Sequence, residues 1–525
     1  MLVGEGERRT AAAVEPRYYL RNFETLLRTL RERDGDLLED DEARFIAQFF
    51  EVQTEARALL VRMVMRKGSL FRANRLEYHE IPDLGEAVKP LIGHGWVDDD
   101  PSLSLEEIFR LFRHDEIAAF PGLGQRARGK SKAERLESLR EAFPQPLQLR
   151  ALCASPDMVY RLVVDGLCER LRGMFFGNFR QELSEFVLAD LGIFRYEAVA
   201  LEVRSRPFAT RAHVHAFHGL HRCRTWLAEG RDPAEIERSM PPPVAGCDWL
   251  DARRDKLCFR LGREWERRGD TEAALRSYAA CAYPEAQTRA QRLRAGPSGK
   301  NGRGRRARPP VIPAFELEFD DHAGGRGVEY RVRDALAATE QSSVHFVENG
   351  LINSLFGLLC WPAIFAPVPG AFFHPFHHGP ADLQCVGFFA RRQSEFAACF
   401  EELRSGLYRR TILARYLDKQ GILSPFVAWG LIDEALLREA LECIPSAHLR
   451  VLFEWISTDV RVNRSGFPDL VQFWPAQGNY RLIEVKGPGD RLQDNQRRCL
   501  RHCLDHGIPV SVCHVRRPGA VSKVA

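Results

Sequence analysis

Two acidic residues and one lysine near the end of the chain have a spacing that could do chemistry. Residues 466–474 and 479–486 read as strands, and the four residues between them have turn composition. If 475–478 form the loop, Asp469 lies directly opposite Glu484, with Cβ atoms about 5 Å apart. Lys486 is two residues beyond Glu484 on the same strand and therefore shares its face.

Two carboxylates held opposite each other repel, and the repulsion grows when apolar neighbours bury them. A divalent cation removes this conflict, and hard oxygen ligands suit Mg²⁺ or Mn²⁺. Such an ion polarises a phosphoryl oxygen and acidifies a bound water, while the lysine orients that water or stabilises developing charge. The plainer alternative is a surface hairpin with an ordinary ion pair. The following helix, expected from about 491 to 506, the strand at 510–515 and the sharp Gly487–Gly489 stop favour the chemical interpretation.

The Pro-Asp, then Glu-x-Lys pattern resembles the PD-(D/E)xK nucleases. More narrowly, the residues around it resemble the VRR-NUC domain and the bacterial form of the Fanconi-associated nuclease family. The matching stretches are Phe467-Pro-Asp-Leu-Val, Leu482-Ile-Glu-Val-Lys-Gly-Pro-Gly-Asp-Arg-Leu-Gln-Asp-Asn-Gln496, Glu348-Asn-Gly-Leu-Ile-Asn-Ser-Leu-Phe-Gly-Leu-Leu-Cys-Trp361 and Asn74-Arg-Leu-Glu-Tyr78.

The resemblance implies roles that spacing alone does not give. It implies Glu348, Asp469, Glu484 and the carbonyl of Val485 as ligands of Mn²⁺ or Mg²⁺, Lys486 as the catalytic lysine, and Gln496 behind the site. Glu348 lies far upstream of the hairpin, and its plainer interpretation is a carboxylate favoured by a helix N-terminus. Arg461 and Arg464, just before the hairpin, are candidates for holding a DNA phosphate or the 5′ phosphate of a flap.

Basic residues gather in two segments of the N-terminal part. A run without acidic residues predicts either a solvated helix face or a surface that contacts backbone phosphates; its candidates are Arg62, Arg66, Lys67, Arg72 and Arg75. A second group lies between two short amphipathic helices that resemble a SAP-type DNA-binding module, the first capped by Ser104; its candidates are Arg126, Arg128, Lys130 and Lys132.

The composition of the chain limits which partners and which cellular compartment can be expected. The chain has 525 residues, 75 Lys plus Arg against 71 Asp plus Glu, and a formal charge of +4, so a nucleic-acid partner requires local positive charge. Thirteen irregularly spaced cysteines argue against a disulfide framework or zinc site and for a reducing cytosol. The family resemblance implies the bacterial cytosol or nucleoid. The apolar window 351–373 is broken by prolines, which predicts a buried helix and an extended segment rather than a membrane span. His374, His377 and His378 are expected in a loop or core role rather than on a metal.

The predicted fold is multidomain, with mostly helical N-terminal two-thirds followed by a mixed α/β nuclease domain. The expected boundaries are 1–100 for a helical DNA-binding domain, 101–150 for the SAP-like module, 151–295 for tetratricopeptide-like helices, 296–310 for a basic linker and 311–525 for the nuclease. The repeat-like positions include Gly262, where two helices would approach, and Tyr278, which would fill the gap.

By resemblance, the expected activity is that of a structure-specific DNA nuclease, a 5′-flap endonuclease and 5′ to 3′ exonuclease in interstrand-crosslink repair. Its partners would be branched DNA, meaning flaps, junctions or crosslinked DNA, and no membrane. The alternatives are a Holliday-junction resolvase and a non-catalytic DNA-binding scaffold, although the intact acidic cluster argues against the scaffold. No Cys or His precedes His79, so the ubiquitin-binding zinc finger of eukaryotic members is not expected.

Overall fold

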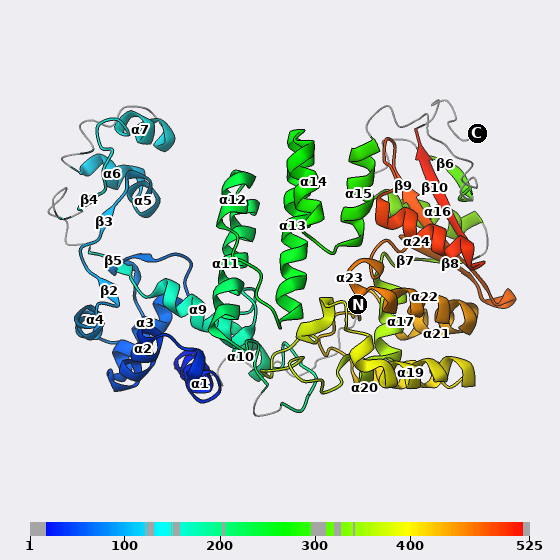
Figure 1. Cartoon of the computed structure of the whole chain (residues 1–525), viewed down its shortest axis with the longest axis horizontal. Coiled ribbons are helices and arrows are strands. Elements are labelled where there is room, and N and C mark those ends of the chain that lie inside the picture. The colour runs from blue at the N-terminus through cyan, green and yellow to red at the C-terminus, as the bar shows by residue number, and fades with distance from the viewer. Residues whose placement is uncertain are drawn as a thin grey trace. The chain divides into compact units, whose positions relative to one another are not determined.

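The computed structural model describes residues 17–120, 123, 131–148, 150, 158–201, 205–295, 311–319, 327–339 and 342–517. The chain divides into two compact units, the first comprising 1–193 with 206–214 and the second 194–205 with 215–525. Figure 1 shows their elements along the chain.

The first unit is built from amphipathic helices with a small sheet. On α1 the residues Tyr19, Phe23, Leu26 and Leu30 recur with helical period and are all buried. The sheet has the order β1-β5-β2, with β5 antiparallel to both neighbours. The elements are α1 (Tyr18–Arg33), α2 (Asp40–Glu51), α3 (Thr54–Val64), β1 (Leu70–Arg72), α4 (Leu84–Gly93), β2 (Val97–Asp98), β5 (Val159–Leu162), α9 (Asp165–Phe176) and α10 (Ser184–Asp190).

A module of short helices lies between β2 and β5. Ser104 and Ser131 each accept a hydrogen bond from the backbone N–H three residues on, so α5 and α7 each start with a capping box. This confirms the predicted helix cap at Ser104. The module comprises β3 (Ser102–Leu103), α5 (Leu105–Leu111), α6 (His114–Ala119), α7 (Lys132–Leu139) and β4 (Leu147–Gln148), which pairs antiparallel with β3.

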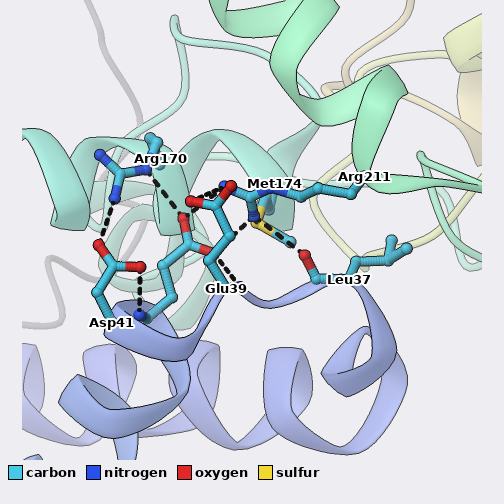
Figure 2. A network of polar contacts seen from close by, with 7 residues as sticks. Leu37, Glu39, Asp41, Arg170, Met174 and Arg211 are labelled. Carbon is cyan, nitrogen blue, oxygen red and sulfur yellow. Dashed lines mark hydrogen bonds and ion pairs between the residues drawn. The ribbon is translucent and has the colours of Figure 1, made fainter.

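A buried carboxylate ties the helices of the first unit together. Glu42 on α2 is fully buried and accepts hydrogen bonds from Arg170 of α9 (2.9 Å) and from Arg211 (2.6 and 3.0 Å). Arg211 also donates to the Leu37 carbonyl (3.0 Å), and Figure 2 shows the two arginines converging on this network. Although burial opposes it, these hydrogen bonds hold the pKa of Glu42 below its usual value, so the charge is compensated.

The helices that precede the second unit's five-stranded sheet pack through one close approach. A Cβ on Gly262 would lie 2.5 Å from the Tyr278 ring, which confirms the expected small and large partners between α13 and α14. The Tyr278 hydroxyl donates to Glu266 (2.6 Å). The helices of this stretch are α11 (Arg211–Ala228), which begins in the first unit, α12 (Pro233–Ser239), α13 (Asp248–Arg268), α14 (Thr271–Ala279) and α15 (Pro284–Ala295).

A five-stranded mixed sheet of order β6-β10-β9-β8-β7 forms the rest of the second unit. β7, β8 and β9 are antiparallel in turn, whereas β9, β10 and β6 are parallel. The strands are β6 (Ala314–Glu318), β7 (Ser343–Phe346), β8 (Leu470–Trp474), β9 (Asn479–Lys486) and β10 (Val510–Arg516). The helices are α16 (Val328–Thr339), α17 (Gly350–Leu359), α18 (Trp361–Ile364), α19 (Gln393–Ser405), α20 (Tyr408–Asp418), α21 (Glu434–Cys443), α22 (Ser446–Thr458), α23 (Val460–Asn463) and α24 (Asp494–Asp505).

The two faces of this sheet have separate cores. Ile483 and Val485 point toward α16 and its Val332, while Leu482 on the other face joins a larger core with α17, α22 and α24. Since side chains alternate along a strand, Glu484 shares the face of Leu482.

The predicted fold class is confirmed, with helical elements dominating before the mixed sheet. The apolar window forms α17 and α18, both buried, and no described helix has the length and apolarity that a membrane crossing requires. The expectation of helices throughout 151–295 missed β5, which returns to pair with β1. The twelve described cysteines are free thiols.

Candidate active site

The β8–β9 hairpin has the register that the sequence predicts. Trp474 pairs with Asn479 and Leu470 with Ile483, so Asp469, one residue before β8, stands opposite Glu484. One carboxylate oxygen of Asp469 accepts a hydrogen bond from the Val485 N–H (2.8 Å). Asp469 is therefore fixed at the end of the sheet by the backbone of the neighbouring strand.

Glu484 is a fully buried carboxylate with little compensation. The Lys486 Nζ lies 2.7 Å from Glu484 Oε1, but neither carboxylate oxygen has a hydrogen bond of good geometry among the described residues. Burial, followed by the charge of Asp469 and, less strongly, that of Glu348, raises the pKa of Glu484 to about 7 despite Lys486. This side chain is an orphaned acceptor that suits a cation.

Backbone hydrogen bonds bring Glu348 to the hairpin across more than a hundred residues. The N–H groups of Val347 and Glu348 both donate to the Asp469 carbonyl (2.8 and 3.1 Å). Asn349, which has φ +49°, accepts from the Phe467 N–H (3.0 Å), and Asn353 donates to the Arg464 carbonyl (2.8 Å). The structure thus places Glu348 beside Asp469, while its role as a ligand stays a prediction.

Asp469 also lies near a carboxylate that sequence reasoning missed. Burial raises the pKa of Asp469, the hydrogen bond from Val485 and the charge of Lys486 oppose this, and repulsion from Glu329 and Glu348 adds to it. Glu329 is the second residue of α16. No motif spacing links it to the hairpin, so only the packing of α16 reveals it.

The side chains described at this site do not form a complete metal cage. Across the described ranges, no three acidic, histidine or cysteine side chains are gathered as a ready ligand set. Asp469 and the orphaned Glu484 offer hard oxygens, and an ion bound there would take further ligands from the backbone, from Glu348 or from a substrate. The residues therefore fit Mg²⁺ or Mn²⁺, and an open coordination position is what catalysis needs.

The remaining predicted residues near the hairpin differ in whether other groups of the protein already bind their side chains. Gln496 forms the capping box of α24, its side chain accepting from the Gln493 N–H (2.9 Å). Arg461 is bound through two nitrogens to Asp459 (2.9 and 2.7 Å), and its side chain is 7% exposed. Arg464 is half-buried, and the described residues give its guanidinium no acidic partner. Arg464 is thus the better candidate for a phosphate.

Two of the predicted phosphate contacts in the first unit already have internal partners. Arg62 is paired with Glu80 and lies 3.9 Å from the centre of the Tyr19 ring. Arg72 is buried and donates to both carboxylate oxygens of Glu116 (2.8 and 2.7 Å). The acidic partners lie outside the acid-free run in sequence, so each arginine forms an ion pair within the first unit, and contact with DNA phosphates stays a prediction for both.

The other basic residues of that run line a pocket of about 130 Å³. Arg66, Lys67 and Arg75 border it with Arg110 of α5, which sequence reasoning missed, and all four are exposed. Arg66 donates to the Arg75 carbonyl (3.0 Å), which holds the two segments together. We refer to these four residues as the basic pocket.

Lys132 and two of the predicted histidines have internal contacts. Lys132 donates to the Phe112 carbonyl (2.8 Å), while Arg126, Arg128 and Lys130 lie outside the described residues. His374 and His377 are buried, with ring centres 3.9 Å apart in a stacked pair, whereas His378 is exposed, which agrees with the expected loop or core role.

Three family models match the chain. The VRR-NUC domain matches residues 403–517, the HTH domain of the Fanconi-associated nuclease matches 17–98, and the Fanconi anemia-associated nuclease SAP domain matches 102–151. The third range contains α5, α6 and α7, and the first contains the whole hairpin.

Relatives that align with most of this chain are also Fanconi-associated nucleases. The Fanconi-associated nuclease 1 homolog of Pseudomonas aeruginosa is 45% identical, over 96% of this chain and 97% of its own length. The human Fanconi-associated nuclease 1 is 22% identical over 96% of this chain and 63% of its own. A crystal structure of paFAN1 bound to a gapped 5′-flap DNA with a two-nucleotide flap matches with TM-score 0.88 and 45% identity, covering 97% of this chain and 99% of that one.

Proposed function

Because the chain belongs to the Fanconi-associated nuclease 1 family, we propose that it is a structure-specific DNA nuclease that cuts 5′ flaps and degrades DNA from 5′ ends during repair. The observation that carries this proposal is the convergence of Asp469, Glu484 and Lys486 at the end of one hairpin, with Glu348 held beside them by the Asp469 carbonyl. Repair of interstrand crosslinks is the finer role that we propose.

Asp469, Glu484, Glu348 and the Val485 carbonyl would hold the divalent cation, Mn²⁺ or Mg²⁺. The buried oxygens of Glu484, which have no hydrogen bond of good geometry and only Lys486 as a cation, support this assignment, since a buried carboxylate is costly unless its charge is balanced. When bound, the ion acidifies water and polarises the scissile phosphate.

The chain's own residues then position the reactants. Lys486 presents an ammonium group at the site, which can donate to the attacking water or to a non-bridging phosphate oxygen as negative charge builds. Arg464 lies next to the hairpin with no acidic partner among the described residues and can hold an adjacent phosphate. Hydrolysis forms a bond from water oxygen to phosphorus and breaks the bond to the leaving oxygen.

We propose that the basic pocket contacts duplex backbone. Its four exposed cations carry no base-reading geometry, so they would fix the position of the duplex rather than select a sequence. Binding by charge should show a steep salt dependence. The match of the neighbouring α5 to a SAP domain supports this use of the surface.

The test is cleavage of matched flap, nicked, forked and four-way DNA in Mn²⁺ or Mg²⁺. We expect cutting near the flap junction and degradation from a 5′ end. Asp469→Ala should abolish cutting and leave flap binding largely unchanged, with Asp418→Ala, an exposed acid on α20, as the control. Equal activity in Asp469→Ala would overturn the site, and a preference for four-way junctions would favour a resolvase instead.

A further inference from the structure

The SAP module, residues 102–148, is docked on the helical domain that α1–α4 form with the sheet β1-β5-β2. Leu70 of β1 and Val159 of β5 share one core with apolar side chains of α5 and α6. Beside this core, Arg72 of β1 donates to both carboxylate oxygens of Glu116 on α6 (2.8 and 2.7 Å). The docking seam thus combines apolar contact with a bidentate ion pair.

The basic pocket lies on this seam, because its walls come from both sides. Arg66 and Lys67 precede β1 and Arg75 follows it, whereas Arg110 belongs to α5 of the SAP module. Leu111, the last residue of α5, lines the pocket as well. Since α5 contributes part of the wall, the pocket is complete only while the module is docked.

Docking brings cations together at this pocket. None of its four cations is bonded to a carboxylate of the described residues, and all four are exposed. Glu107, one turn before Arg110 on α5, accepts instead from Arg161 of β5 (3.3 Å). Like charges 4 Å apart repel by ~1 kcal/mol in water, and physiological salt screens this repulsion over about 8 Å. In the absence of an anion, the pocket therefore opposes docking.

A phosphate group would balance this charge. Guanidinium groups present paired N–H donors that match the oxygens of a phosphate, and a lysine ammonium adds a compact point charge. The pocket has a volume of about 130 Å³, below the roughly 300–1,000 Å³ of sites that enclose larger organic ligands, so it suits a small anion. A phosphate held by Arg110 and by Lys67 or Arg75 at once would join the module to the helical domain.

We propose that the basic pocket is a composite site for one phosphate group, and that the bound phosphate locks the SAP module onto the helical domain. This inference rests on the proposed function for the source of the phosphate, which is the backbone of duplex DNA. A ligand that binds only the docked arrangement stabilises docking by the same factor by which docking raises its affinity. Arg110 thus opposes docking without phosphate and favours docking with phosphate.

Two plainer roles for Arg110 give different results. If the exposed cations only touch DNA, phosphate leaves the stability of docking unchanged, and Arg110→Gln affects DNA affinity alone. If Arg110 is itself a docking contact, Arg110→Gln destabilises docking in every anion. Only the composite site predicts both that phosphate stabilises docking through Arg110 and that Arg110→Gln does not weaken docking in chloride.

The experiment is hydrogen exchange of the full chain, measured on the amides of α5 and α7 in sodium phosphate and in sodium chloride of equal ionic strength. When phosphate is at about ten times the concentration of its half-maximal effect, exchange in the wild type should slow about tenfold, or 1.4 kcal/mol. The amides of α1 are the internal reference, because a general salt effect would slow them too. Arg110→Gln should lose the phosphate effect and should exchange no faster than the wild type in chloride. Arg140→Gln, which removes a cation paired with Glu137 on the same module but outside the pocket, should keep the phosphate effect.

Equal exchange of the wild type in both salts, or a phosphate effect that survives Arg110→Gln, would overturn the inference, and so would faster exchange of Arg110→Gln in chloride. Should Arg110→Gln fail to fold, Lys67→Gln from the other wall decides by the same criteria. Blunt duplex DNA should protect α5 and α7 as phosphate does; protection by phosphate alone would keep the composite site and reject duplex backbone as its ligand. Flap cleavage by the same wild-type sample in Mn²⁺ tests the proposed function separately, since a sample that cuts no flap rejects that function whatever the exchange shows.

Discussion

Replacing the buried pair Glu484 and Lys486 together should stabilise the metal-free protein and abolish its activity. Burial, together with the charges of Asp469 and Glu348, raises the pKa of Glu484 from 4.5 to about 7 despite Lys486. At 1.36 kcal/mol per pKa unit this corresponds to a cost on the order of 3 kcal/mol for keeping the carboxylate charged. Glu484→Gln/Lys486→Met removes both charges with little change in volume. Replacing a buried ion pair by uncharged side chains of similar volume often leaves the stability unchanged or raises it by about 1–4 kcal/mol.

The single variant Lys486→Met should do the opposite. It leaves the Glu484 carboxylate buried without its cation, and breaking such a pair costs about 3–5 kcal/mol. At pH 8 in EDTA the order of stability is therefore double variant, wild type, then Lys486→Met. The control Glu434→Gln/Arg438→Met removes an exposed pair on α21 and should change stability by less than about 1 kcal/mol.

Thermal unfolding with and without Mn²⁺ provides the assay. The unfolding transition that Mn²⁺ shifts reports the second unit, which contains the proposed metal site. The free energy of unfolding of the wild type should rise by about 2.7 kcal/mol when free Mn²⁺ is 100 times its dissociation constant. The double variant should gain nothing and cut no flap. Our reasoning would be refuted by a double variant that unfolds below the wild type in EDTA, or by one that Mn²⁺ stabilises equally.

Three other predictions concern the scaffold and the basic pocket. Arg72 holds the pKa of Glu116 at about 2, below its usual 4.5. The ion pair therefore stabilises the first unit fully above pH 4.5, and this stabilisation is lost as the pH falls toward 2. Hydrogen exchange of α6 should show that Glu116→Gln lowers stability by about 1–2 kcal/mol at pH 7 and by progressively less at acid pH. Arg75→Gln should weaken binding to flaps of any sequence and reduce the salt slope by about one, and an unchanged slope would remove it from the interface. Gly357→Ala should destabilise the nuclease unit by about 1–3 kcal/mol in thermal unfolding, since its Cβ would lie 2.7 Å from that of Phe426; a midpoint equal to that of the wild type would contradict this packing.

The hairpin register could be predicted from the sequence because it depends on local information. A four-residue loop fixes which residues pair, and a period of two then places Lys486 on the face of Glu484. The position of Glu348 depends instead on β7 pairing with β8, a contact between distant segments that no local pattern encodes. Only the family resemblance brought Glu348 to the site.

The ion pairs of Arg62 and Arg72 could not be predicted from the sequence for the same reason. The segment that contains Arg62 and Arg72 has no acidic residue, so its charges look free in sequence. Folding brings Glu80 and Glu116 to them from the following loop and from α6. A run of one charge therefore predicts a surface only where tertiary partners are absent, as for Arg75 among the described residues.

The site also shows how carboxylates can be brought together while their oxygens stay available to a cation. At the end of the sheet, the Asp469 carbonyl accepts from the Val347 and Glu348 N–H groups, and one Asp469 carboxylate oxygen accepts from Val485. Backbone groups thus do the positioning, so the side chains of Glu348 and Glu484 need no protein hydrogen bond to stay in place. Two packed cores hold the strands against the resulting repulsion. Carboxylates that the backbone positions and that Lys486 only partly compensates retain their affinity for a cation, which is why the same arrangement that costs stability in the metal-free protein can support hydrolysis.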